Sequence, residues 1–209
     1  MTSFFRSSTR LEAFSDAVFA IAITLLILEI RVPSAEQAAT PELLWKALQD
    51  RWPSYFAFLL SFGTILIAWI GHHLMLQGIV RVSQLLVWVN GLFLLLMTVL
   101  PFTTALVAEH LLRPSGTIAT AVYAGLNVLN CMVYLLLARL TQAASLRRTR
   151  TSRFRILQAL VSLVLSGGAV ALAFVSPIGS LLLVAATWIW WCLPSLILPA
   201  DEEDIAQAS

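Results

Sequence analysis

Long apolar runs alternate with short polar breaks along most of the chain. The runs lie at about 12–31, 53–75, 83–108, 116–140, 156–176 and 178–198. Each is close to the ~20 residues that a helix needs to cross the hydrocarbon core of a bilayer. Breaks such as Ser176-Pro-Ile-Gly179 contain the residues that end helices. The pattern predicts an all-α integral membrane protein with six transmembrane helices.

Composition strengthens this prediction and excludes other classes. Hydrophobic residues make up 59% of the chain and charged residues 11%, whereas a soluble domain carries roughly 25% charged residues. No basic face with interleaved aromatic residues is present, so we expect no nucleic-acid partner. Cys131 and Cys192 fall inside apolar runs without metal-ligand spacing. We therefore expect no disulfide framework, no resident metal and no cofactor.

The arginines predict the orientation. If the N-terminus is inside, nine arginines are cytoplasmic and four basic residues are outside. This bias places both termini in the cytoplasm of a multi-pass protein of the cell membrane. The first run is longer than the core of a signal peptide, so we expect it to be retained. We expect residues 1–200 to form one membrane domain and residues 201–209 to form an acidic cytoplasmic tail. Pro41–Leu48 is predicted to form a short amphipathic helix on the outer surface.

Polar side chains gather in one membrane layer near the cytoplasmic ends of the first three runs. They are Arg10, Ser15, Asp16, Trp69, His72, His73 and Asn90. A carboxylate facing lipid costs roughly 2.5 kcal/mol or more near the bilayer centre, so Asp16 should be paired or face protein or water. We predict an interhelical polar cluster, with Arg10 and Asp16 as members, that fixes the rotation of the first helix. Adjacent histidines point about 100° apart on a helix, which argues against a shared metal site.

An apolar stripe follows this layer. Ile21, Leu25 and Leu28 recur at helical spacing, with Thr24 beside them. Such a stripe indicates helix packing, lipid contact or a pore lining whose hydrophobic constrictions gate by dewetting. A carbonyl selectivity filter of the Thr-Val-Gly-Tyr-Gly kind is absent from the sequence.

Several motifs in the first three runs resemble those of one family. They are Arg10-x-x-x-Phe14-Ser15-Asp16, Trp69-x-x-His72-His73, Asn90 and Pro101-Phe102-Thr103. The combination resembles the potassium-channel family of the lysosomal transmembrane protein 175 and its prokaryotic relatives. The last three runs match that family only as hydrophobic helices. A single six-span unit resembles the prokaryotic form.

The resemblance implies a homotetramer in which four first helices surround a central pore permeable to potassium ions. Ile21 would correspond to the narrowest constriction, and Leu25 and Leu28 to further layers, with the Thr24 hydroxyl near the pore. Arg10, Phe14, Ser15 and Asp16 would join Trp69, His72, His73 and Asn90 in the network that anchors the pore helix.

Two functions remain in competition. The favoured one is passive conduction through a potassium-permeable cation channel without a carbonyl filter. The alternative is a proton-coupled secondary transporter that uses Asp16 and His72/His73 as a relay. An enzyme is disfavoured, because one acid and two histidines lack an arranged nucleophile and no cofactor motif is present.

Overall fold

The computed structural model describes residues 8–36, 38–77, 79, 82–145 and 150–197. These residues form helices and connections, with one isolated β-bridge between Ile79 and Ser145. The elements are α1 (Ser8–Leu25), the 3₁₀-helix η1 (Leu26–Glu29), α2 (Pro41–Asp50), α3 (Trp52–Leu76), α4 (Gln84–His110), α5 (Gly116–Ala144), α6 (Arg150–Ala173) and α7 (Pro177–Ile197). The predicted all-α class is thus confirmed for the described part of the chain. The predicted acidic tail at 201–209 lies outside it.

Five helical stretches are long and apolar enough to cross a membrane. They are Thr9–Glu29, Trp52–Leu76, Gln84–His110, Gly116–Ala144 and Phe154–Ala173. The sixth predicted run coincides with α7, whose apolar described part, Pro177–Cys192, is shorter. The chain is therefore a multi-pass membrane protein.

Several helix boundaries differ from the apolar pattern, and the differences on either side of the basic region between α5 and α6 are instructive. α5 continues to Ala144 rather than ending at 140, and α6 begins at Arg150 rather than at 156. Hydropathy reports only the part of a helix that suits lipid, whereas backbone hydrogen bonding continues through polar residues beyond it. The apolar pattern therefore predicts helices that are shorter than α5 and α6 at the ends that face the basic region.

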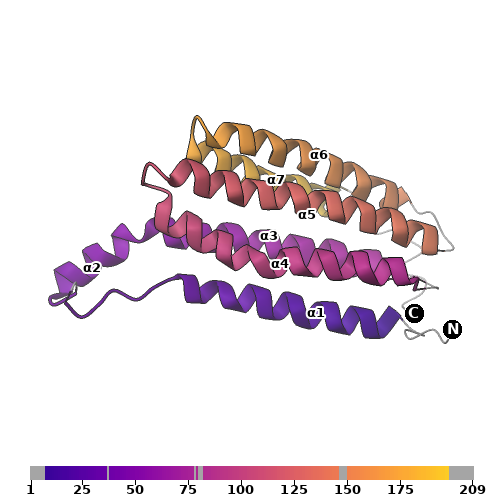
Figure 1. The fold of residues 1–209 in the computed structure, drawn as a ribbon, viewed down its shortest axis with the longest axis horizontal. Helices are drawn as coiled ribbons and strands as arrows, with labels where there is room; N and C mark the ends of the chain where they lie inside the picture. Colours follow the sequence, from indigo (N-terminus) through magenta and orange to yellow (C-terminus); the bar gives the residue numbers. More distant parts are fainter. Residues whose placement is uncertain (1–7, 37, 78, 80–81, 146–149, 198–209) are drawn as a thin grey trace.

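The helices form layers in which α1 occupies an edge. Figure 1 shows α1 on one side of the bundle, α3 and α4 beside it, and α5, α6 and α7 on the far side. α1 packs against α3 and α4 through a core that includes Phe19, Leu26 and Phe93. A second core, including Tyr123 and Leu181, joins α3, α4 and α5 to α6 and α7. The first helix is thus supported from one side by its own chain.

The predicted surface helix is present as α2. Thr40 caps it, since its Oγ1 accepts a hydrogen bond from the Leu43 amide at 3.3 Å, and Pro41 opens the first turn. Its residues are exposed or half-buried, and α2 projects away from the bundle (Figure 1). Hydrogen bonds from its own backbone amide and from Thr40 lower the pKa of Glu42. The helix start therefore gains stability while Glu42 is ionised, and loses it as the pH falls through this lowered pKa.

Candidate functional site

Helix α1 has one buried face and one exposed face. The buried residues are Leu11, Ser15, Phe19, Ala22 and, in η1, Leu26. The exposed residues include Arg10, Phe14, Ile21, Thr24, Leu25 and Leu28. The buried residues recur every three or four positions and the exposed residues lie between or beside them, as expected for two sides of one helix. The stripe that the sequence singled out therefore lies on the side of α1 that its own chain leaves uncovered.

The stripe stays on one face although the helix changes type. Ile21, Leu25 and Leu28 are 59%, 44% and 69% exposed, whereas Leu26 is 0% exposed. Ile21 and Leu25 are four residues apart in the α-helix, and Leu28 follows Leu25 by three where η1 replaces it. In a 3₁₀-helix, side chains three residues apart eclipse one another. The tighter turn therefore keeps the Leu28 side chain in line with those of Ile21 and Leu25.

Thr24 adds an acceptor to this apolar face. Its Oγ1 donates to the backbone oxygens of Ala20 and Ile21, each at 2.9 Å. Because the hydroxyl proton is held by the helix, the oxygen presents lone pairs outward. Thr24 and Leu25 are both exposed, so both side chains are available on this side of the helix.

A buried chain of hydrogen bonds fixes the other face. The Ser15 hydroxyl donates to the Leu11 carbonyl at 2.8 Å, and so accepts from Asn90 Nδ2 at 3.0 Å. The Asn90 amide oxygen then faces His72 Nε2 at 2.6 Å. An amide oxygen only accepts, so His72 carries its proton on Nε2. Three donors in series thus join α3 and α4 to α1.

Aromatic packing reinforces the same junction. Phe19 of α1, His72 of α3 and Phe93 of α4 meet pairwise, with ring centroids 5.3–6.1 Å apart. The rings of His72 and Phe93 are nearly parallel, at 11°. All three side chains are buried. One residue from each helix therefore fixes both the separation and the rotation of α1, α3 and α4.

A second polar group lies on the accessible side of this junction. The Trp69 indole donates to Asp16 Oδ1 at 2.8 Å and stacks on His73, with ring centroids 5.8 Å apart. Gln77 Nε2 donates to His73 Nε2 at 2.9 Å. Sequence reasoning did not include Gln77, although its position four residues after His73 on one helix could have indicated the contact.

Arg10 and Phe14 do not join the cluster in this chain. Both are exposed, and Arg10 makes no hydrogen bond or ion pair with any described residue. The predicted membership of Arg10 in the polar cluster is therefore not met by contacts within one chain. Arg10 and Asp16 are six residues apart, and this spacing places their side chains on different sides of α1. Trp69 supplies the partner of Asp16 instead.

This geometry predicts unequal effects of two substitutions. We expect Arg10→Ala to change the unfolding free energy of the subunit by less than about 0.5 kcal/mol, as at other surface positions. Asp16→Ala leaves the Trp69 indole without its acceptor and should be the more destabilising change. Thermal unfolding of both purified variants in one detergent checks the order. Equal losses of stability would mean that Arg10 has a structural partner.

Another buried polar cluster was missed by sequence reasoning. Ser61 Oγ of α3 lies 2.6 Å from Thr104 Oγ1 of α4 and donates to the Tyr123 hydroxyl of α5 at 3.1 Å. Single hydroxyls in apolar runs gave no signal, because each can also bond to its own helix. The three residues join α3, α4 and α5 and lie away from α1, so we assign them a structural role.

No metal centre is evident among the described residues. They contain no group of three or more His, Cys, Asp or Glu side chains placed to hold an ion. His72 and His73 instead hydrogen-bond to Asn90 and Gln77. The polar side chains of this junction therefore hold helices together through hydrogen bonds, while the stripe of α1 stays exposed.

Comparison with known proteins matches the part of the chain that carries this junction. The family described as "Endosomal/lysosomal potassium channel TMEM175" matches residues 10–101. A potassium channel of Chamaesiphon minutus is 47% identical over 125 residues, which cover 60% of this chain and 61% of that protein. A potassium channel of Streptomyces collinus is 47% identical over 117 residues, covering 56% and 55%. The chain thus aligns with somewhat over half the length of these relatives.

Vertebrate proteins and a solved structure extend the comparison. The endosomal/lysosomal proton channel TMEM175 of Gallus gallus is 36% identical over 108 residues, only 22% of its own length. These relatives are named as channels rather than enzymes. The crystal structure of a lysosomal potassium-selective channel TMEM175 homologue from Chamaesiphon minutus superposes with a TM-score of 0.82 and 39% identity, covering 90% of this chain and 97% of that one. The resemblance noted in the sequence is confirmed, and the chain belongs to the TMEM175 family.

Proposed function

We propose that this chain is one subunit of a potassium-permeable cation channel whose central pore is lined by α1 of four copies. The observation that carries the proposal is the two-sided character of α1. One side is held at a fixed rotation by the Ser15–Asn90–His72 hydrogen bonds, and the other presents an uncovered stripe. Membership in a family of channels makes ions the occupants to expect beside that stripe.

A homotetramer supplies the missing side of the pathway. One edge helix cannot enclose a conduit, but identical chains related by a rotation axis place the same face of α1 around that axis. The position of α1 at the edge of the bundle suits this arrangement (Figure 1). In the full proposal each subunit spans the bilayer of the cell membrane six times, with α7 as the sixth span, and both termini are cytoplasmic.

Rings of apolar side chains would control conduction. Ile21 forms the narrowest ring, and Leu25 and Leu28 form further rings toward the outer end of α1. Apolar constrictions of this kind oppose ion passage by excluding water. Thr24 offers lone pairs rather than a proton, since its proton is bound to the helix backbone, and this favours cations. Backbone carbonyls inside a helix are committed to hydrogen bonds, so potassium passes side chains rather than a carbonyl filter.

The proton-coupled transporter fits the geometry less well. A relay from His72 toward α1 must cross the Asn90 amide, which does not exchange a proton at ordinary pH. Asp16 accepts from the Trp69 indole, a group that only donates. The candidate acid and the histidines are therefore joined through groups that do not carry protons onward.

Reconstitution tests the channel directly. We expect the purified protein to have the mass of a tetramer. In planar bilayers bathed in solutions whose only permeant cation is potassium, we expect single-channel current steps. The current should need no proton gradient, and the bi-ionic reversal potential reports the preference for potassium over sodium. Protein-free bilayers are the control. A stable monomer in several detergents, or saturable flux that requires a proton gradient, would contradict the proposal.

A further inference from the structure

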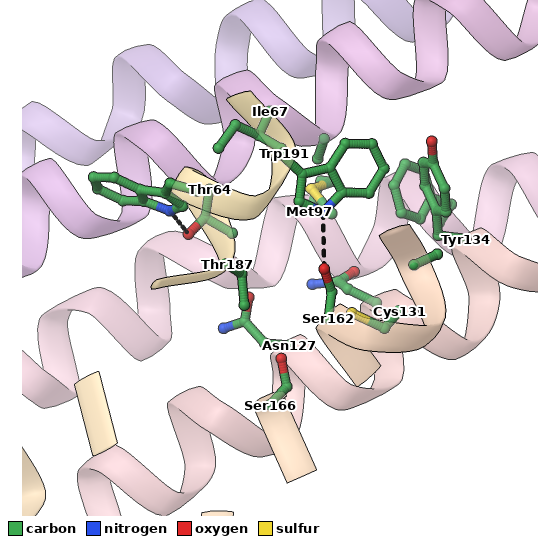
Figure 2. A pocket seen from close by; sticks show the side chains of 15 residues that line it. Thr64, Ile67, Met97, Asn127, Cys131, Tyr134, Ser162, Ser166, Thr187 and Trp191 are labelled. Carbon is green, nitrogen blue, oxygen red and sulfur yellow. Dashed lines mark hydrogen bonds between the residues drawn. The ribbon is translucent and has the colours of Figure 1, made fainter. Parts of the chain in front are cut away.

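A partly open cavity lies between helices of the bundle, and no residue of α1 lines it. Its volume is about 70 Å³, and side chains from α3, α4, α5, α6 and α7 line it. Figure 2 shows Asn127 and Cys131 of α5 facing Ser162 and Ser166 of α6, with Thr187 of α7 nearby. Phe93 and Met97 of α4 supply part of the apolar wall. The cavity therefore combines hydroxyl and amide groups with aromatic and aliphatic surface.

Two polar lining residues, Asn130 and Tyr134, have buried side-chain atoms without a hydrogen-bond partner among the described residues, and Asn130 leaves both a donor and an acceptor unpaired. Asn130 is 6% exposed, and both its Nδ2 and its Oδ1 are buried. In a membrane span an unpaired amide is costly, because neither lipid nor bulk water can satisfy it. A molecule in the cavity that both donates and accepts would satisfy both atoms.

Two neighbouring polar groups are already engaged, whereas the buried Tyr134 hydroxyl has no partner among the described residues. The Trp191 indole donates to Ser162 Oγ at 2.8 Å (Figure 2), and Asn127 Nδ2 donates to the Tyr123 carbonyl at 2.9 Å. The Tyr134 hydroxyl points away from Ser162 in Figure 2 and lies close to Gly71, where an added Cβ would approach it to 2.6 Å. Asn130 therefore offers an occupant both a free donor and a free acceptor, and the Tyr134 hydroxyl is the other unpaired group of the lining.

The walls also restrict the charge and size of an occupant. None of the lining residues is Asp, Glu, His, Lys or Arg, so an ion would be desolvated without a counter-charge. A volume of about 70 Å³ exceeds the roughly 10–15 Å³ that one water needs and is below the roughly 150 Å³ of a cavity that binds benzene. The site therefore suits a neutral occupant of a few heavy atoms.

We propose that this cavity is a binding site for a small neutral molecule that donates and accepts hydrogen bonds at Asn130. A cluster of ordered waters and a short primary alcohol share this chemistry. The site adjoins the aromatic junction of α1, because Tyr134 contacts Phe93 at 5.9 Å between ring centroids and Phe93 contacts Phe19 at 6.1 Å. It is separate from the conduction pathway, so its occupancy is tested without reference to current.

The test is a high-resolution structure of the full-length protein in lipid, with and without 2-bromoethanol. We expect ordered solvent within about 3.2 Å of both Asn130 amide atoms. With the alcohol, an anomalous bromine signal in the cavity identifies an organic occupant, whereas unchanged solvent peaks identify water as the resident. An empty cavity in both structures, or Asn130 turned to bond with protein, overturns the proposal.

Two variants assign the signal to Asn130. Asn130→Leu should remove the solvent peaks and lower bromine occupancy at a fixed alcohol concentration by about tenfold, the expected loss for about one or two neutral hydrogen bonds. Asn127→Leu is the matched control, because that amide nitrogen already bonds to its own helix. Equal losses in the two variants would show that Asn130 does not hold the occupant. If Asn130→Leu fails to fold, the wild-type structures still decide.

Discussion

Ile21→Asn is expected to raise the potassium conductance of the reconstituted channel by about an order of magnitude. In the proposed tetramer, four Ile21 side chains around the pore axis would exclude water and oppose an ion, whereas an amide at the same place would hold water. Lowering the barrier by about 1.4 kcal/mol is enough for a tenfold rate. Single-channel recording with potassium, followed by the potassium–sodium reversal potential, measures the change. We expect the preference for potassium to weaken, since a wetted ring discriminates less between hydrated cations.

Leu26→Asn is the matched control for this experiment. Ile21 and Leu26 lie on opposite sides of the first span and differ strongly in exposure, at 59% and 0%. An amide at position 26 is buried against α3 and α4 and costs roughly 1–3 kcal/mol if it finds no partner. We therefore expect Leu26→Asn to lower stability without raising current. Unchanged conductance of a tetrameric Ile21→Asn protein would remove Ile21 from the pore and leave the stripe as a packing or lipid surface.

The sequence predicts the elements of this fold well because the bilayer sets their length. An apolar run of ~20 residues has few alternatives to a spanning helix, and the amphipathic pattern of Pro41–Leu48 indicates the short helix α2. Helix ends are harder, since α6 begins at Arg150 among charged residues that hydropathy does not count. The packing of α1 at the edge of the bundle is a property of tertiary contacts and has no signal in the runs themselves.

The candidate site is predictable only in part for a related reason. The sequence identifies Ser15, His72 and Asn90 as polar residues at one membrane depth, and in the structure hydrogen bonds join them directly. Arg10 lies at the same depth but on the exposed side of α1, away from Ser15. Membrane depth alone does not distinguish these two sides of the helix. The stripe is ambiguous in sequence because packed, lipid-facing and pore-lining residues share one spacing. The unpaired amide of Asn130 depends on what surrounds it from four other helices.

Asn90→Leu is expected to cause the largest loss of assembly. The substitution removes the acceptor of His72 Nε2 and the donor to Ser15, and so breaks the chain of hydrogen bonds between α1 and its two supporting helices. A buried donor without a partner costs about 1–3 kcal/mol, and the rotation of α1 loses its fixed reference. We expect a lower melting temperature and a smaller tetramer fraction by native mass spectrometry.

Asn127→Leu separates the loss of this junction from the loss of any buried amide. Both asparagines are buried, but Asn127 donates to the Tyr123 carbonyl one turn away on the same helix. Asn127→Leu should therefore leave the packing of α1 against α3 and α4 unchanged and the tetramer intact. Ser15→Ala is the complementary change, because it removes the acceptor of Asn90 Nδ2 while keeping the His72–Asn90 bond, and it should give an intermediate loss. If Asn90→Leu forms stable tetramers with wild-type conductance, Phe19, His72 and Phe93 hold the pore helix by packing alone, and the hydrogen bonds only satisfy polar groups that the bilayer would otherwise leave unpaired.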